Sequence, residues 1–123
     1  MSDVIAAAET AVFDPKAVSS LTGHADDHEF AFVFVGRFRQ LLPERVRRIE
    51  AAMVGSDLRE AMDAVLSLRT SSCTLGAEEL CAVSTRIENH LRASDFAGAR
   101  VAARDLAEAE HRAGDALAAF LSD

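Results

Sequence analysis

Residues 62–77 read Met-Asp-Ala-Val-Leu-Ser-Leu-Arg-Thr-Ser-Ser-Cys-Thr-Leu-Gly-Ala, and this stretch decides the fold that we expect for the chain. Its apolar residues recur at intervals of three and four, which is the period of an α-helix with one buried face. Gly76 then interrupts the pattern before a new apolar series begins. The stretch therefore predicts the second half of an amphipathic helix followed by a break.

The same stretch resembles the signature of histidine phosphotransfer (HPt) domains, His-x-Leu-Lys-Gly-Ser-Ser-x-x-Leu-Gly-Ala. Seven residues fall in register with it, namely Leu68, Arg69, Ser71, Ser72, Leu75, Gly76 and Ala77. Leu66 occupies the position of the phosphoacceptor histidine. A leucine side chain has no atom that can carry a phosphoryl group, so the resemblance implies a phosphorelay component without its reactive residue.

Length and composition favour one globular domain. The chain has 123 residues, of which 50% are hydrophobic, and such a chain can bury a substantial core. Its net charge of −7 argues against nucleic-acid binding, which requires a surplus of basic residues. No apolar run approaches the roughly 20 residues that span a bilayer, and the first residues carry acids where a signal peptide carries bases. We therefore expect a cytoplasmic protein without nucleic-acid or membrane partners.

Cysteines and histidines give no sign of a metal site. Cys73 and Cys81 are two thiols in a chain with a sufficient core, so we expect small, reduced residues and neither a disulfide scaffold nor a zinc site. His24 and His28 are four residues apart but lie in and just after the first loop, so they do not pair on one helix, and we expect surface residues at His24, His28, His90 and His111. No metal or other cofactor is expected.

The chain divides into a leader and a helical domain. Residues 1–13 have alanine-rich helical propensity but no packing partner, so they are expected to be frayed or weakly docked. Residues 14–123 form the HPt-like domain, which opens with a short helix at Asp14-Pro15. A long helix is predicted from Asp26 to Val54 with a kink at Pro43.

Three further helices complete the expected domain. The third begins after Ser56 as N-cap and buries a stripe of Leu58, Ala61, Met62, Val65, Leu68 and Ser72. The fourth follows Gly76 and uses Leu80, Val83, Ile87 and Leu91. The last begins after Ser94-Asp95 and continues through Phe96 to Leu121 as one helix. Four long helices with short connections predict an all-α, antiparallel up-and-down four-helix bundle with a short extra N-terminal helix. The resemblance to HPt domains extends over residues 14–121.

The position of Leu66 predicts a contact surface. At about 100° per residue, Leu66 lies roughly 80–100° from the centre of the buried stripe, at the rim of the core. The expected partner-binding residues are Arg59, Met62, Asp63, Leu66, Arg69 and Thr70. By the resemblance, Arg69 stands for the lysine that helps to hold the phosphoryl group. Thr70 stands for a glycine that leaves room for the partner. The alternative is that Leu66 folds over the core edge and has no function.

The second helix is locally basic. Its arginines are Arg37, Arg39, Arg45, Arg47 and Arg48, and the resemblance implies that such a face would attract the acidic pocket of a receiver domain. The alternative is a solvated face with partners within the helix, such as Glu44 with Arg48.

Three functions remain open from the sequence. The first is a non-catalytic binding module for a response-regulator receiver domain or a sensor histidine kinase, with no enzymatic activity and present as a monomer or weak homodimer. The second is an active phosphotransfer protein that uses His90 or His111. The third is a structural or oligomerising bundle in which the second and third helices bury Met62 and Leu66 against a copy of themselves.

Overall fold

The computed structural model describes residues 11–22 and 28–122, and all regular structure among them is α-helical. The helices are α2 (Pro15–Thr22), α3 (His28–Gly55), α4 (Leu58–Leu75), α5 (Glu78–Arg92), α6 (Phe96–Ala103) and α7 (Leu106–Ser122). The predicted all-α class is confirmed. Residues 1–10 of the expected leader lie outside the described part of the chain.

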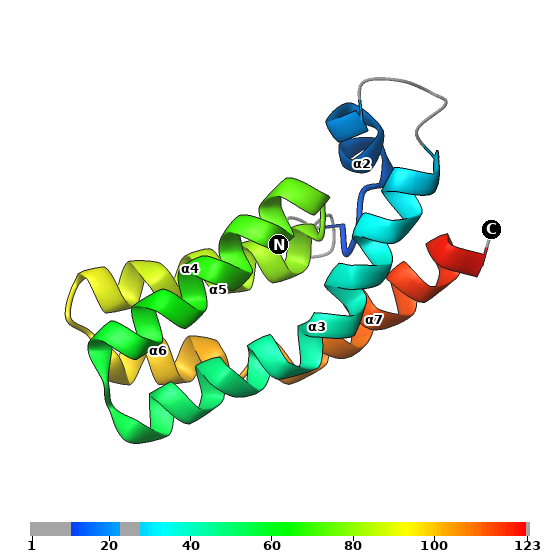
Figure 1. Cartoon of the computed structure of the whole chain (residues 1–123). Coiled ribbons are helices and arrows are strands. Elements are labelled where there is room, and N and C mark those ends of the chain that lie inside the picture. Colours follow the sequence, from blue (N-terminus) through cyan, green and yellow to red (C-terminus); the bar gives the residue numbers. More distant parts are fainter. Residues whose placement is uncertain (1–10, 23–27, 123) are drawn as a thin grey trace, which may run out of the picture.

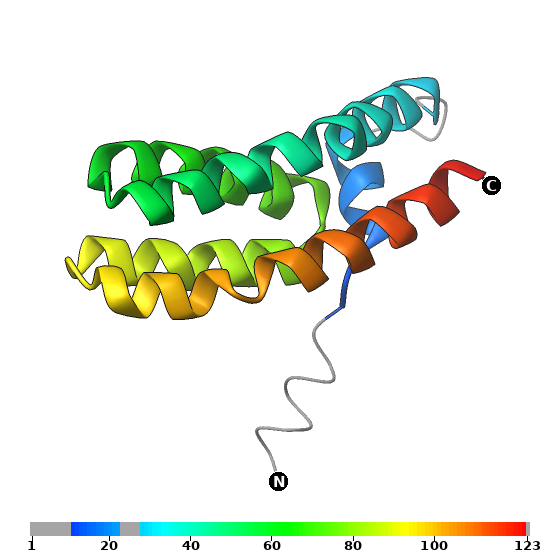
Figure 2. The same ribbon diagram turned by 90° about the horizontal axis from the view of Figure 1, so that it is seen from below.

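The helices form an antiparallel bundle in which α6 and α7, laid end to end, take the fourth position (Figure 1). α4 packs against α3 and α5, α5 packs against α6 and α7, and α3 packs against α7. The start of α3 and the end of α7 project beyond the α4–α5 pair in both ribbon views (Figure 2). The predicted four-helix bundle with a short additional N-terminal helix is therefore confirmed.

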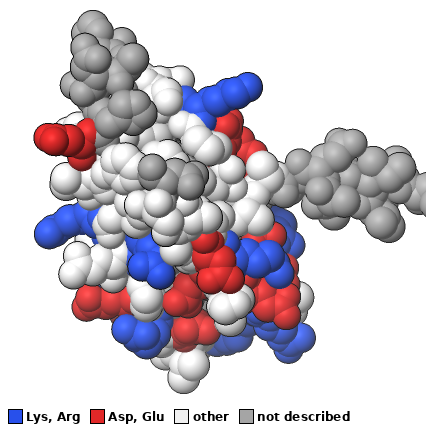
Figure 3. Space-filling model, turned by 90° about the vertical axis from the view of Figure 1, so that its right-hand side faces the viewer, with Lys and Arg blue, Asp and Glu red and all other residues white. Residues whose placement is uncertain are grey.

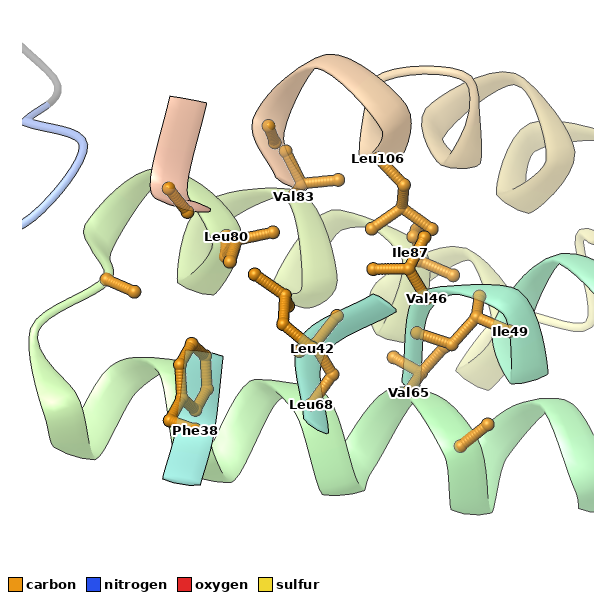
Figure 4. Close-up of a cluster of buried hydrophobic side chains, with 14 of the residues drawn as sticks. Phe38, Leu42, Val46, Ile49, Val65, Leu68, Leu80, Val83, Ile87 and Leu106 are labelled. Carbon is orange, nitrogen blue, oxygen red and sulfur yellow. The ribbon is translucent and has the colours of Figure 1, made fainter. Parts of the chain in front are cut away.

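The core lies between these helices and fixes the position of α4. Figure 4 shows side chains from α3, α4, α5 and α7 directed toward one another, among them Phe38, Leu42, Val46, Ile49, Val65, Leu68, Leu80, Val83, Ile87 and Leu106. Each fully buried leucine or isoleucine contributes about 1.5–3 kcal/mol of hydrophobic stabilisation. The packed core thus fixes the position of α4 and of its outer surface.

α3 continues without interruption through Pro43. Proline has no N–H to donate to the preceding turn, and its ring crowds the carbonyl four residues earlier, so a bend is expected there. The helix changes direction along its length (Figure 1).

The connection between α3 and α4 differs from the prediction in its cap. Asp57, and not Ser56, is the N-cap of α4, because its Oδ1 accepts a hydrogen bond from the Glu60 N–H at 3.1 Å. Ser56 instead has a φ of 56°, in the left-handed region. Leu58, in the first turn of α4 beside this connection, remains 44% exposed and does not join the buried stripe.

Gly76 joins α2 to the turn between α4 and α5. Its φ is 91°, and its N–H donates to the Ser72 carbonyl at 3.1 Å, which ends α4. The Asp14 N–H donates to the Gly76 carbonyl at 2.8 Å. A Cβ at position 76 would lie 2.6 Å from the Asp14 carbonyl oxygen and 2.7 Å from Ala17 Cβ. Glycine is therefore required both by the backbone conformation and by the close approach of α2.

The last predicted helix is divided in two, which corrects the prediction of one continuous helix. α6 ends at Ala103 and α7 begins at Leu106. At the junction the N–H groups of Arg104 and Asp105 donate to carbonyls three residues earlier, each at 3.2 Å. These bonds replace the bonds to carbonyls four residues earlier that an α-helix has, and this tighter turn separates α6 from α7.

The two cysteines also differ from the prediction of free thiols. Cys73 and Cys81 form a disulfide, with their Cα atoms 4.9 Å apart. The reversal at Gly76 places the last turn of α4 beside the first turn of α5, so residues eight apart in sequence become neighbours.

The end of the expected leader contacts the bundle. Val12 and Phe13 pack against the core, and the ring of Phe13 meets that of Phe120 edge-on, with centroids 5.5 Å apart.

Candidate functional site

Five of the seven residues that match the signature lie inside the molecule. Leu68, Ser72, Leu75 and Ala77 have no exposed surface, and Gly76 is buried against α2. These residues pack helices together and are not accessible to a partner.

Part of the predicted contact set does form a continuous surface on α4. Arg59, Asp63 and Thr70 are exposed and Leu66 is half-buried. Their intervals of four, three and four residues place them on one side of the helix, over a length of about 16 Å. We refer to Arg59, Asp63, Leu66 and Thr70 as the α4 stripe.

The structure places the other two predicted residues, Met62 and Arg69, away from the centre of this stripe. Met62 is half-buried and packs against the core. The Nε atom of Arg69 lies 2.7 Å from Glu88 Oε1 on α5. Arg69 is therefore directed toward the neighbouring helix.

Glu88 is a buried carboxylate with two arginine partners. Its side chain is 9% exposed, Oε1 pairs with Arg69, and Oε2 accepts a hydrogen bond from Arg92 Nε at 2.7 Å. A carboxylate this buried is tolerated because both oxygens are paired. Glu88 was not among the site residues predicted from the sequence. The i, i+4 spacing to Arg92 was visible in the sequence, but the contact with Arg69 depends on how α4 and α5 pack.

Three of the arginines on α3 are committed to neighbouring helices. Arg39 Nε donates to the Gly114 carbonyl on α7 at 3.2 Å, and Arg45 donates to Ser71 Oγ at 2.7 Å. Arg48 pairs with Glu60 on α4 at 2.7 Å, so the Glu44–Arg48 pair suggested by the sequence is not formed.

The hydrogen bond from Arg48 to Glu60 raises the pKa of Arg48 above its usual value. Arg37 and Arg47 are exposed and make no ion pair with any residue that the structure describes. The basic character of the helix is therefore only partly available to a partner.

His90 is held by Asp95 at the connection between α5 and α6. Its Nδ1 lies 3.0 Å from Asp95 Oδ2, and Asp95 Oδ1 accepts the Gly98 N–H at 2.8 Å as the N-cap of α6. The hydrogen bond from Gly98, and then that from His90, lower the pKa of Asp95. Because a carboxylate at Nδ1 favours the proton on that atom, Nε2 of the neutral ring keeps its lone pair.

His111 lies on α7, in a different environment. Its Nε2 is 3.4 Å from Asp115 Oδ2, and both side chains are largely exposed. His24 lies outside the described residues, as does the side chain of His28.

An open hollow of about 410 Å³ adjoins His111 and is lined by Ala107, Glu108, His111 and Arg112. Arg112 is paired with Glu79 at 2.9 Å and lies 3.6 Å from Glu108. The hydrogen bond to Glu79 raises the pKa of Arg112. Its charge is balanced by carboxylates, and the hollow lies on a different helix from the α4 stripe.

Among the residues that the structure describes, no three His, Cys, Asp or Glu side chains are grouped so that they could hold a metal ion. None of the helices in this part of the chain has the length and apolar content needed to cross a membrane.

Comparison with known proteins yields one match. The family model described as Hpt domain matches residues 33–122, a range that includes α4, α5, α6 and α7 and most of α3. No curated protein and no solved structure is similar enough to match.

Proposed function

The chain belongs to the Hpt domain family, the phosphotransfer modules of two-component phosphorelays, and we propose that this member binds a receiver or kinase domain without transferring phosphate. It would act as an adaptor, decoy or inhibitor that occupies the partner's docking surface. The observation that carries the proposal is the α4 stripe, in which Leu66 stands, by the resemblance of the signature, at the family's acceptor position.

The chemistry of the stripe supports binding without transfer. Leu66 offers partly exposed apolar surface, and Arg59, Asp63 and Thr70 surround it with charged and polar groups. An apolar centre with a polar rim is the usual anatomy of a protein contact. No atom of these four side chains is a nucleophile of the kind that receives phosphate from an aspartyl phosphate at neutral pH.

The ion pair of Arg69 also supports binding without phosphate transfer. In an active member the basic residue three positions after the acceptor would neutralise phosphoryl oxygens. Here Arg69 is already paired with the buried carboxylate of Glu88. Its release would leave Glu88 with Arg92 alone, which costs free energy.

Leu66→Asp is the direct test. It adds a charge at the centre of the stripe, and calorimetric titration with a panel of receiver and kinase domains should show affinity lost by a factor of ten or more, the order expected for a central apolar contact. The matched control is Val101→Asp, because Val101 is an apolar residue on α6 that is 58% exposed and lies outside the stripe.

Circular dichroism should report the same helical content for both variants. Equal binding by Leu66→Asp and wild type would remove the α4 stripe from the proposal. Absence of binding by the folded wild-type protein across the panel would reject the binding module itself.

A second candidate is phosphotransfer through His90, and the His90–Asp95 pair is the observation that favours it. With Nδ1 bonded to Asp95, Nε2 could attack the phosphorus of a partner's aspartyl phosphate. The N–P bond would form as the O–P bond breaks, and the partner's carboxylate would leave.

Phosphohistidine is stable in alkali and labile in acid, so incubation with a phosphorylated receiver distinguishes the two functions. Label of this type that is lost in His90→Gln and kept in His111→Gln would support transfer through His90. Absence of label on the folded wild-type protein would reject it.

A further inference from the structure

The first half of α3 has a solvent-facing side that the bundle leaves uncovered. Val33 is 69% exposed and Phe30 is 59% exposed. At about 100° per residue, Val33 lies roughly 170° around the helix from the centre of the buried stripe of Ala31, Val35, Phe38 and Leu42. Val33 is thus at the centre of the outer face.

The neighbours of Val33 on this face have opposite charges at equal distances. Glu29 is one helical turn before Val33 and Arg37 is one turn after it, and both are exposed. Neither forms an ion pair with any side chain that the structure describes in 11–20 or 29–122. The three residues lie at i, i+4 and i+8 and so form one ridge along the helix.

This face is also accessible to a second helix. Gly36, on the same side, has open space where a Cβ would stand. α3 projects beyond the α4–α5 pair at this end of the molecule (Figure 2), so those helices do not shield it. Figure 3 views this end, where uncharged residues cover much of the centre and charged side chains of both signs lie below them.

We propose that α3 pairs antiparallel with α3 of a second copy of the chain, about a two-fold axis at Val33. An antiparallel pair centred on one residue sets position 33 − n against 33 + n, so Glu29 of each copy meets Arg37 of the other. The face is self-complementary, as a two-fold interface must be. Val33 packs on its own equivalent, and Phe30 extends the apolar contact at the edge.

The size of the face predicts a weak dimer. One stretch of helix per copy buries less than the roughly 1,000 Å² of a stable interface, so association depends on protein concentration. The two ion pairs determine the direction of pairing more than its strength. The surface is distinct from the α4 stripe, so a dimer of this kind leaves the partly exposed Leu66 accessible to a partner.

Sedimentation velocity over a wide concentration series tests the proposal, with circular dichroism to establish that each variant is folded. Wild type should shift from monomer to dimer as concentration rises. Glu29→Arg alone and Arg37→Glu alone should each remain monomeric, because each places like charges opposite one another. The control is Arg47→Glu, an exposed charge on the same helix away from the ridge, which should dimerise as wild type does.

Mixing the two single variants is the decisive step. The Glu29→Arg copy has two arginines on its ridge and the Arg37→Glu copy has two glutamates, so an equimolar mixture should form a heterodimer although neither variant dimerises alone. The double variant Glu29→Arg/Arg37→Glu should dimerise again. A wild-type protein that stays monomeric throughout would overturn the proposal. A wild-type dimer with no association in the mixture would overturn this face and direction of pairing.

Discussion

The guanidinium of Arg69 on α4 lies 2.7 Å from the carboxylate of Glu88 on α5, and Glu88 is the only buried charged residue among those that the structure describes. The contact links the helix that has the α4 stripe to its most closely packed neighbour. It also accounts for the orientation of an arginine that the sequence assigned to the partner surface.

Stability should depend on which side of this contact is removed. Glu88→Gln keeps the shape of the side chain and leaves two arginines that reach water, so it should cost about 1 kcal/mol. Arg69→Met/Arg92→Met leaves the buried carboxylate without a cation and should cost about 3 kcal/mol at neutral pH. Urea unfolding measures both values, and a larger loss for Glu88→Gln would contradict this account.

Two leucines of α4 should respond very differently to truncation. Leu68 has no exposed surface, and Leu68→Ala should lower the free energy of unfolding by about 3 kcal/mol because it leaves a cavity. Leu58 is 44% exposed, and Leu58→Ala should cost less than about 1 kcal/mol. Thermal unfolding of the two variants side by side measures the difference, and equal losses would show that the core is assigned wrongly.

Asp95 should make stability fall in acid. Its pKa in the folded protein is below the usual 3.8, mainly because of the Gly98 N–H and then His90. A group with a depressed folded pKa contributes stability above its unfolded pKa, and the contribution is lost as pH falls through the folded pKa.

Thermal melting of wild type should therefore show this loss below about pH 4, and Asp95→Asn should show a shallower dependence there. His90→Ala should reduce the dependence only in part, since Gly98 is the larger cause. Identical pH profiles for wild type and Asp95→Asn would contradict the role of the cap.

Reduction of the Cys73–Cys81 disulfide should destabilise the protein without unfolding it. The bond joins residues eight apart, and closure of so short a loop contributes about 2 kcal/mol by restricting the unfolded chain. Urea unfolding with and without reductant should show this loss, while helical content in water stays the same. Cys73→Ala/Cys81→Ala should not respond to reductant, and a response from that variant would assign the effect to something other than the disulfide.

The helices were predictable because their signals are local. The Asp14-Pro15 start, the apolar period of α3 and α4 and the break at Gly76 are each visible within a few residues. The division at Arg104 was not predicted, because alanine and leucine continue the helical pattern through it and only two tightened hydrogen bonds mark the break. Ser56 was predicted as the N-cap of α4, but Asp57 has that role. The two residues are adjacent and both types commonly cap helices, so only the backbone geometry decides between them.

The candidate site was predictable only where it depends on one helix. The spacing of Arg59, Asp63, Leu66 and Thr70 follows from the period of α4. The ion pairs of Arg48 with Glu60 and of Arg69 with Glu88 each join two helices. They depend on how the helices pack, and no local sequence pattern specifies them. The same holds for the two cysteines, whose pairing follows from the reversal of the chain between them.

Gly76 shows what a sequence signature can and cannot report. It is needed here because Asp14 and Ala17 leave no room for a larger residue, and this requirement is the same whether or not a phosphoryl group is ever bound. Its buried neighbours Leu68, Ser72 and Leu75 are needed for equally mechanical reasons. The motif thus mainly determines how the helices pack against one another. A signature of this kind can therefore persist for its packing role alone, whatever residue stands at position 66.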